Sequence, residues 1–304
     1  MLQDIAFSSI RIATPIVLAA LGGLYTFQAG ILNIALDGFM IVAAFAAVGA
    51  AYATGSLTVG VLAGVAASMA LAAVLATFNL RFRAHIFIAG IAVTFLAYGL
   101  TALLLKSIFN QDGVFASPDI PVFLAIRIPG LEAVPVLGPL LSGHTLLVYA
   151  AYLLVPVVSW TLYRTRWGLR VRMIGEAEDA ARAAGVNADR IKVETMLISG
   201  LFCGLAGAYL SLGYVSLFAK EMTAERGLIA LAAIFFAKGR PGPTTVVALL
   251  FGVATALAVR LPEMTGVAPQ LLQIIPYLAT ILALVAVGLR VNRGNQGGGW
   301  RFDT

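Results

Sequence analysis

Long apolar stretches separated by short polar connections run along the whole chain. Because a helix needs about 20 largely apolar residues to cross a membrane, the pattern predicts spans near residues 8–27, 34–54, 57–79, 86–105, 144–163, 193–214, 224–238, 243–260 and 270–289. The stretch at 224–238 is short for a complete crossing. Together with residues 28–37 it is a candidate for a broken or re-entrant piece, which is tolerated only where protein or a cavity surrounds it.

The predicted fold is all-α, a polytopic membrane protein with about 8–10 transmembrane helices, discontinuous segments and one short cytoplasmic helix. Residues 1–290 are expected to form a single transmembrane domain, and residues 291–304 a cytoplasmic tail. Composition supports this class, because 61% of the residues are hydrophobic and only 11% are charged. Soluble domains contain roughly 45–50% apolar and about 25% charged residues.

Basic residues gather at the ends of the apolar stretches, which is typical of membrane orientation by the positive-inside rule. Arg81 and Arg83 mark one cytoplasmic connection, and the loop at 164–192 holds seven basic residues. Alternation then places the long loop at 106–143 outside the cell and, by counting backwards, the N-terminus outside as well. The net charge of +6 is therefore explained by orientation in a lipid membrane, and no nucleic-acid partner is expected.

The outer loop contains five prolines, Pro118, Pro121, Pro129, Pro135 and Pro139. Proline fixes φ and removes a backbone donor, so the loop is expected to be extended chain rather than helix. Two interpretations fit such a long loop: a docking surface or lid, and a packed cap without a specific role.

A polar island interrupts the apolar pattern at residues 164–186, and within it residues 176–184 have the sequence EAEDAARAA. Alanine favours helix, the acidic residues Glu176, Glu178 and Asp179 suit a first turn, and Gly185 is a natural stop. Glu178 and Arg182 are four residues apart, in the orientation that supports a helix. Residues 176–184 are therefore predicted to form one helix of about two and a half turns.

Four alanines of this predicted helix fall at spacings that share one face: Ala177, Ala180, Ala181 and Ala184. Small side chains allow another surface to approach closely, while the opposite face carries charge. Two interpretations are open on these grounds. The helix either sits in a groove of another protein, or packs against its own cytoplasmic loops.

Four stretches together resemble one family. The segment TRWGLRVRMIGEAEDAARAAGVNADRIK resembles the cytoplasmic coupling segment of permease subunits in bacterial ABC importers, in the branch for branched-chain amino acids, simple sugars and nucleosides. GGLYTFQAGILNIALDGFM resembles that branch's first signature, N-I-x-x-(D/E)-G. ERGLIALAAIFFAKGRPGPT resembles the second, and LLQIIPYLATILAL the last span. The resemblance covers residues 21–289.

The resemblance implies that the short helix docks into a cleft of a cytosolic ATPase subunit. The residues that would carry this coupling are Gly175, Glu176, Ala177, Glu178, Ala180, Ala181, Ala184 and Gly185. The ATPase must be a separate chain, because no lysine here is preceded by Gly and followed by Ser or Thr, as a P-loop requires. A second permease, identical or paralogous, and an extracytoplasmic substrate-binding protein are the other implied partners.

Candidates for the substrate pathway lie in or beside the predicted spans. Asn33 and Asp37 are four apart and are expected to share one helix face, where they either line the pathway or cap a helix at the cytoplasmic boundary. Thr94 and Phe95 lie mid-span. At the outer entrance of the last span stand Gln270 and Gln273, one turn apart. A weak echo between GILNIALDG (30–38) and GLIALAAIF (227–235) is compatible with an inverted repeat.

The predicted function is that of a transport subunit, not an enzyme, with no cofactor and no metal site. The resemblance implies that it would move nucleosides or simple sugars inward across the bacterial cytoplasmic membrane. Branched-chain amino acids are the alternative cargo. An ion-coupled secondary transporter is disfavoured, because few acidic residues fall within the predicted spans: Asp37, and Glu194 and Glu225 next to the span ends. No cluster of His, Asp or Ser supports a membrane-embedded lipid enzyme.

Overall fold

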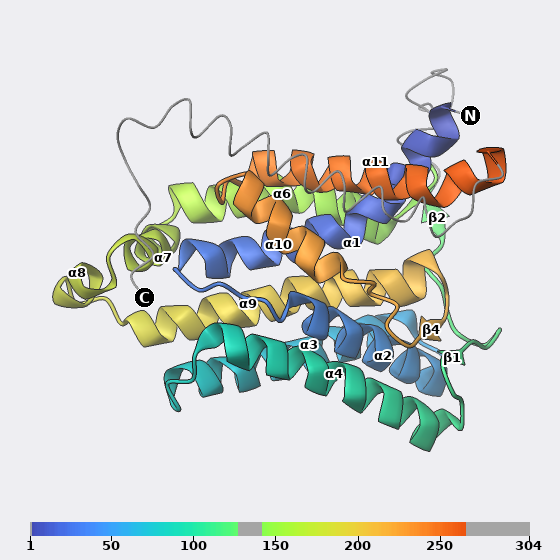
Figure 1. Cartoon of the computed structure of the whole chain (residues 1–304), viewed down its shortest axis with the longest axis horizontal. Helices are drawn as coiled ribbons and strands as arrows, with labels where there is room; N and C mark the ends of the chain where they lie inside the picture. The colour runs from blue at the N-terminus through green and yellow to red at the C-terminus, as the bar shows by residue number, and fades with distance from the viewer. Residues whose placement is uncertain (1, 127–141, 266–304) are drawn as a thin grey trace.

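The computed structural model describes residues 2–126 and 142–265, most of which form long helices (Figure 1). The helices are α1 (Leu2–Gln28), α2 (Leu36–Thr54), α3 (Leu57–Leu80), α4 (Ile86–Phe109), α6 (Leu146–Arg164), α7 (Arg166–Glu176), α8 (Glu178–Ala183), α9 (Ala188–Ala208), α10 (Arg226–Phe236) and α11 (Pro241–Thr265). A π-helical segment, η1 (Tyr209–Tyr214), continues α9. The predicted span at 270–289 and the predicted tail lie outside the described residues.

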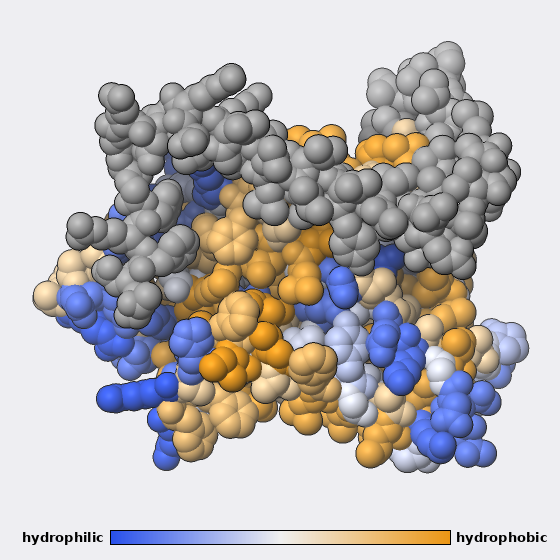
Figure 2. Space-filling view, in the orientation of Figure 1, coloured by the Kyte–Doolittle hydropathy of each residue, from blue (hydrophilic) through white to orange (hydrophobic). Residues whose placement is uncertain are grey.

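The all-α membrane class is confirmed. Among the described residues, seven helices are long and apolar enough to cross a membrane, judged by length and composition: α1, α2, α3, α4, α6, α9 with η1, and α11. The eleven-residue α10 is too short for a crossing, as its apolar stretch indicated. Figure 2 shows hydrophobic side chains over the middle of the visible face and hydrophilic ones toward its two ends, as expected for a chain surrounded by lipid.

The two ends of the bundle carry different structures (Figure 1). One end, here called the coupling end, bears α7 and α8. The opposite outer end bears the start of α1 and two small antiparallel sheets, in which β1 (Val114–Phe115) pairs with β4 (Phe218–Ala219) and β2 (Ala125–Ile126) pairs with β3 (His144–Thr145). Beyond the end of α4, residues 110–126 of the outer loop contain short strands and turns but no helix, in agreement with the two prolines there, Pro118 and Pro121. The arrangement also agrees with the predicted alternation, which separates the loops at 106–143 and 164–192.

The core lies where α9 packs against α1, α2 and α3, and most residues of α1, α2 and α9 are buried. Glycine makes this close packing possible. A Cβ atom at Gly207 of α9 would lie 2.2 Å from the backbone oxygen of Met40 and 2.8 Å from the Cβ of Ala43, both in α2. The two backbones are therefore in direct contact.

Replacing Gly207 with leucine is expected to force α9 away from α2. Overpacking of a filled core costs about 3 kcal/mol, so the thermal unfolding midpoint of the detergent-purified protein should fall clearly. Gly99→Leu is the matched control, because a Cβ at Gly99 of α4 would meet nothing within 4 Å. Equal midpoints for the two variants would contradict the tight α2–α9 contact.

Candidate functional site

The chain is interrupted between α1 and α2. Gly30 has φ +77° and ends α1, where its N–H donates to the oxygen of Phe27 while the N–H of Ile31 donates to the oxygen of Thr26. These two bonds satisfy the last carbonyls of the helix, as in a Schellman cap. Residues 31–34 then run without helix, so the broken piece predicted at 28–37 is present.

Asn33 lies in this break and is buried. Its Oδ1 accepts a hydrogen bond from the N–H of Ala35 at 3.0 Å, and its Nδ2 donates to Oγ of Ser199 in α9 at 3.2 Å. The expectation that Asn33 and Asp37 share one helix face is therefore wrong. α1 stops before Gly30, so Asn33 lies in the non-helical residues that precede α2. Its side chain supports the start of α2 through the hydrogen bond from Ala35.

Asp37, in the first turn of α2, is the centre of a buried polar cluster that joins three helices. Its Oδ2 accepts from the Thr223 hydroxyl at 2.9 Å and also from the hydroxyl of Tyr98 in α4. Its Oδ1 accepts from the backbone N–H of Gly227, the second residue of α10, at 2.9 Å. We call Asp37, Tyr98, Thr223 and Gly227 the polar centre.

Two helix N-termini meet at the polar centre. A Cβ at Gly227 would lie 2.3 Å from the backbone nitrogen of Asp37, so α10 and α2 begin in direct contact. From there α2 runs to the outer end, where Tyr52 packs against Phe115, whereas α10 runs to the coupling end. The N-termini of both helices favour a negative charge, which together with the three donors balances the Asp37 carboxylate. The opposite directions of α2 and α10 agree with the weak inverted echo in the sequence.

The remaining pathway candidates separate in space. Thr94 packs on α2, because a Cβ at Gly38 would lie 2.8 Å from its Cα, and its hydroxyl donates to the oxygen of Gly90. Phe95 is 71% exposed on the outside of the bundle, so it does not join Thr94 in the interior of the chain. Gln270 and Gln273 lie outside the described residues.

The predicted single helix at 176–184 is wrong in its boundaries. The chain forms two helices instead, α7 ending at Glu176 and α8 beginning at Glu178. Ala177, with φ −155° and ψ 88°, breaks the path between them. Glu176 therefore ends a helix rather than starting one, whereas Glu178 does occupy a first turn as predicted.

The end of α8 agrees with the sequence. Gly185 has φ +81°, and its N–H donates to the oxygen of Arg182, while the N–H of Val186 donates to the oxygen of Ala181. This is again a Schellman cap, for which glycine is favoured because it adopts a positive φ without strain.

The four alanines do not form one uniform face. Ala180 and Ala184 are exposed, and so is Ala177 at the break between the helices. Ala181 is instead only 1% exposed and lies within the core of this chain. The predicted docking face therefore loses Ala181, because α8 turns that side toward its own chain. Gly175, Glu176 and Gly185 remain exposed.

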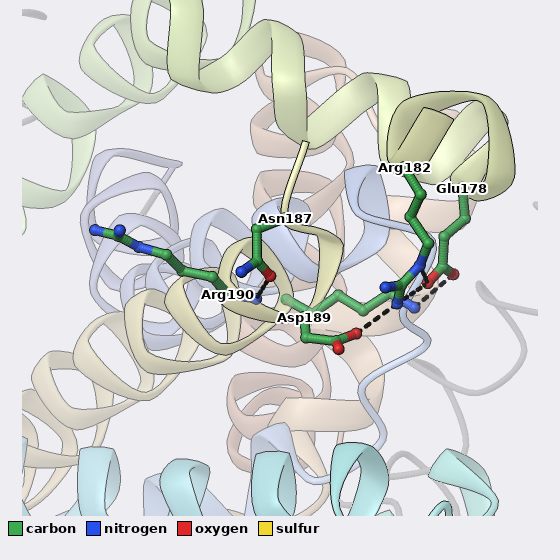
Figure 3. A network of polar contacts seen from close by, with 6 residues as sticks. Glu178, Arg182, Asn187, Asp189 and Arg190 are labelled. Carbon is green, nitrogen blue, oxygen red and sulfur yellow. Dashed lines mark hydrogen bonds and ion pairs between the residues drawn. The ribbon is translucent and has the colours of Figure 1, made fainter. Parts of the chain in front are cut away.

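An ion cluster fastens α8 to the start of α9 (Figure 3). Glu178 accepts from Arg182 at 2.9 Å and from Lys192 of α9 at 2.6 Å, and Arg182 also reaches Asp189 at 2.5 Å. Partial burial by itself raises the pKa of Glu178, but the hydrogen bonds from Lys192 and Arg182 outweigh it and hold that pKa below its ordinary value. Glu178 is therefore ionised at neutral pH, and the cluster keeps its charges.

The helix α7, which the sequence reasoning missed, seats the coupling segment on the bundle. Thr165 caps it by accepting from the N–H of Gly168 at 3.0 Å, and Trp167 donates from Nε1 to Glu194 of α9 at 2.7 Å. Buried residues recur every three positions, at Gly168, Val171 and Ile174. The sequence signal that could have predicted α7 is the capping residue Thr165 followed by small or apolar residues at helical spacing.

These features define a class: a polytopic membrane subunit whose discontinuous helices meet in its interior and whose exposed helix pair lies at one end. The family described as the branched-chain amino acid transport system permease component matches residues 5–289. The guanosine ABC transporter permease NupQ of Bacillus subtilis is 32% identical over 93% of this chain and 91% of its own length. The putative glucose permease TsgC13 of Haloferax volcanii is 33% identical, over 91% and 89%. The nucleoside permease NupC of Lactococcus lactis is 29% identical, over 93% and 92%.

The chain therefore belongs to this family of ABC importer permease components. It is a multi-pass protein of the inner membrane and a transport component rather than an enzyme. Membership in the family implies association with an ATPase and with a substrate-binding protein.

Proposed function

We propose that this chain forms the transmembrane pathway of an ATP-driven nucleoside importer, and that α8 docks on the ATPase. The observation that carries the proposal is the exposed α8, which lies at the end of the bundle opposite the outer loop and is fastened to α9 by the ion cluster (Figures 1 and 3). A helix attached in this way transmits a displacement caused by a bound partner to the core helix α9.

The docking surface consists of the exposed small residues Gly175, Ala177, Ala180 and Ala184, with Glu176 and Gly185 at its borders. Because these residues have short side chains or none, the walls of an ATPase cleft can pack directly against the backbone of α8. One such helix serves one ATPase subunit. A second permease, either another copy of this chain or a paralogue, would present the second helix.

The cargo is proposed to be a nucleoside because guanosine and nucleoside permeases are among the relatives that align over most of their own length. Glucose is the second candidate, supported by the 33% identical Haloferax protein. Both solutes are neutral and rich in hydroxyl groups. A neutral solute fits a chain whose buried carboxylate, Asp37, already has its charge balanced by hydroxyl and N–H donors.

Uptake into membrane vesicles tests this proposal. Vesicles carrying the chain with its ATPase and binding protein should accumulate radiolabelled guanosine only when ATP is supplied. An excess of unlabelled guanosine should compete, whereas leucine should not. Competition by glucose but not guanosine would move the assignment to sugars, and competition by leucine alone would move it to amino acids. Uptake that follows an ion gradient without ATP would contradict the importer.

A further inference from the structure

The last turn of α7 touches the break after α1. A Cβ at Gly175 would lie 2.2 Å from the backbone oxygen of Gln28 and 3.0 Å from the nitrogen of Gly30. A Cβ at Gly30 would in turn lie 3.3 Å from the Cα of Gly175. The coupling segment therefore rests, backbone against backbone, on the point where α1 stops.

Gln28 continues this contact to a second discontinuous helix. Its Nε2 donates to the backbone oxygen of Gly239, just beyond the end of α10, at 2.7 Å. The same corner is tightly packed, because a Cβ at Gly239 would lie 2.7 Å from the ring of Phe27, which itself meets Phe235 of α10 edge to face. The hydrogen bond of Gln28 and the ring of Phe27 thus both join the end of α1 to the end of α10.

The helix α10 is consequently held at both ends. Gln28 holds the turn after its last residue, and the carboxylate of Asp37 holds its second residue, Gly227. The two attachment points are separated by the length of α10, about 16 Å for eleven residues at 1.5 Å each. If α10 moves as a rigid helix, a displacement of the turn at Gly239 therefore also displaces Gly227 at the polar centre.

We propose that Gln28 is the positioning residue that relays movement of the coupling segment to α10 and, through α10, to the polar centre. The inference rests on the proposed docking of α8. The route is the contact of Gly175 with Gln28 and Gly30, followed by the hydrogen bond from Gln28 to Gly239. Residues with positive φ lie close to both ends of this hydrogen bond. Gly30 lies near Gln28, and Lys238 precedes the acceptor Gly239, which also has a positive φ. Such loop positions absorb hinge motion at little cost.

The contact through α9 is a different kind of link. The ion cluster and the Trp167–Glu194 bond attach the coupling segment to a long helix that is packed on α1, α2 and α3. Such a helix transmits motion of the whole bundle. The Gln28 hydrogen bond instead leads to the short helix α10, which begins at the polar centre.

Gln28→Met tests the relay, because methionine is of similar size but lacks the amide donor. The complex with the ATPase should assemble and hydrolyse ATP, while the number of solute molecules imported per ATP falls at least about tenfold. Thr77→Val is the matched control. Thr77 is exposed near the end of α3, and among the described residues its hydroxyl bonds only the oxygen of Ala73 in its own helix, so the import ratio should not change.

An unchanged import ratio in Gln28→Met would overturn the relay and leave docking intact. Loss of ATPase association in this variant would also overturn it, because Gln28 would then act on docking. If Gln28→Met does not accumulate in the membrane, Gln28→Glu replaces it, since glutamate has the same length and no amide donor. Docking itself is judged separately, by whether a bulky residue at the exposed Ala180 abolishes association.

Discussion

Replacing Ala180 with tryptophan is expected to abolish ATP-driven uptake and association with the ATPase. Ala180 is exposed on α8, so its own chain tolerates the larger ring, whereas a closely fitting cleft does not. A steric penalty of about 3 kcal/mol corresponds to roughly a hundredfold weaker association. Co-purification of the ATPase with tagged permease measures association, and vesicle uptake measures function.

Two matched variants make this result specific. Ala53→Trp places the same ring on an exposed alanine near the outer end of α2, and it should leave association unchanged. Ala181→Trp differs because Ala181 is buried, so this variant should lower the amount of folded protein. Normal association of Ala180→Trp would remove α8 from the docking surface.

Replacing Asp37 with leucine is expected to destabilise the folded chain by about 3 kcal/mol or more, because three donors, two of them fully buried, lose their acceptor and each costs about 1–3 kcal/mol. The donors are the hydroxyls of Tyr98 and Thr223 and the N–H of Gly227. The thermal unfolding midpoint in detergent measures the effect, and uptake should fall to background. Asp37→Asn should be milder, since the amide keeps the size and one acceptor oxygen.

Asp112→Leu controls for the loss of an acidic residue. Asp112 lies at the outer end, and its side chain is 79% exposed beside Lys106, so the midpoint should hardly move. An Asp37→Leu protein as stable as Asp112→Leu would mean that the polar centre does not hold α2, α4 and α10 together.

Local rules predicted part of the coupling segment correctly. The stop at Gly185 and the Glu178–Arg182 pair depend only on residues a few positions apart, and both are present. The break at Ala177 was missed because it depends on packing: α7 continues until Gly175 meets the end of α1. Burial of Ala181 was missed for the same reason, since the sequence shows which residues share a face but not which partner covers it.

Long-range partners explain what was missed in the interior. The polarity of Asn33 and Asp37 within an apolar region marked them as important, but their helical spacing was misleading. Asn33 bonds Ser199, and Asp37 bonds residues 61 and 186 positions away. No local pattern predicts such pairs. The seven spans among the described residues were predictable, because the membrane imposes a length and an apolar composition on each one.

The polar centre also constrains the order in which this chain is inserted during synthesis. Asp37 emerges from the ribosome before Tyr98, and long before Thr223 and Gly227, which supply its other two donors. A carboxylate within a bilayer costs about 2.5–3.5 kcal/mol even by insertion measurements. The Asp37 carboxylate therefore gains all three of its donors only after the start of α10 has been made. The late part of the chain thus completes the polar interior of the early part.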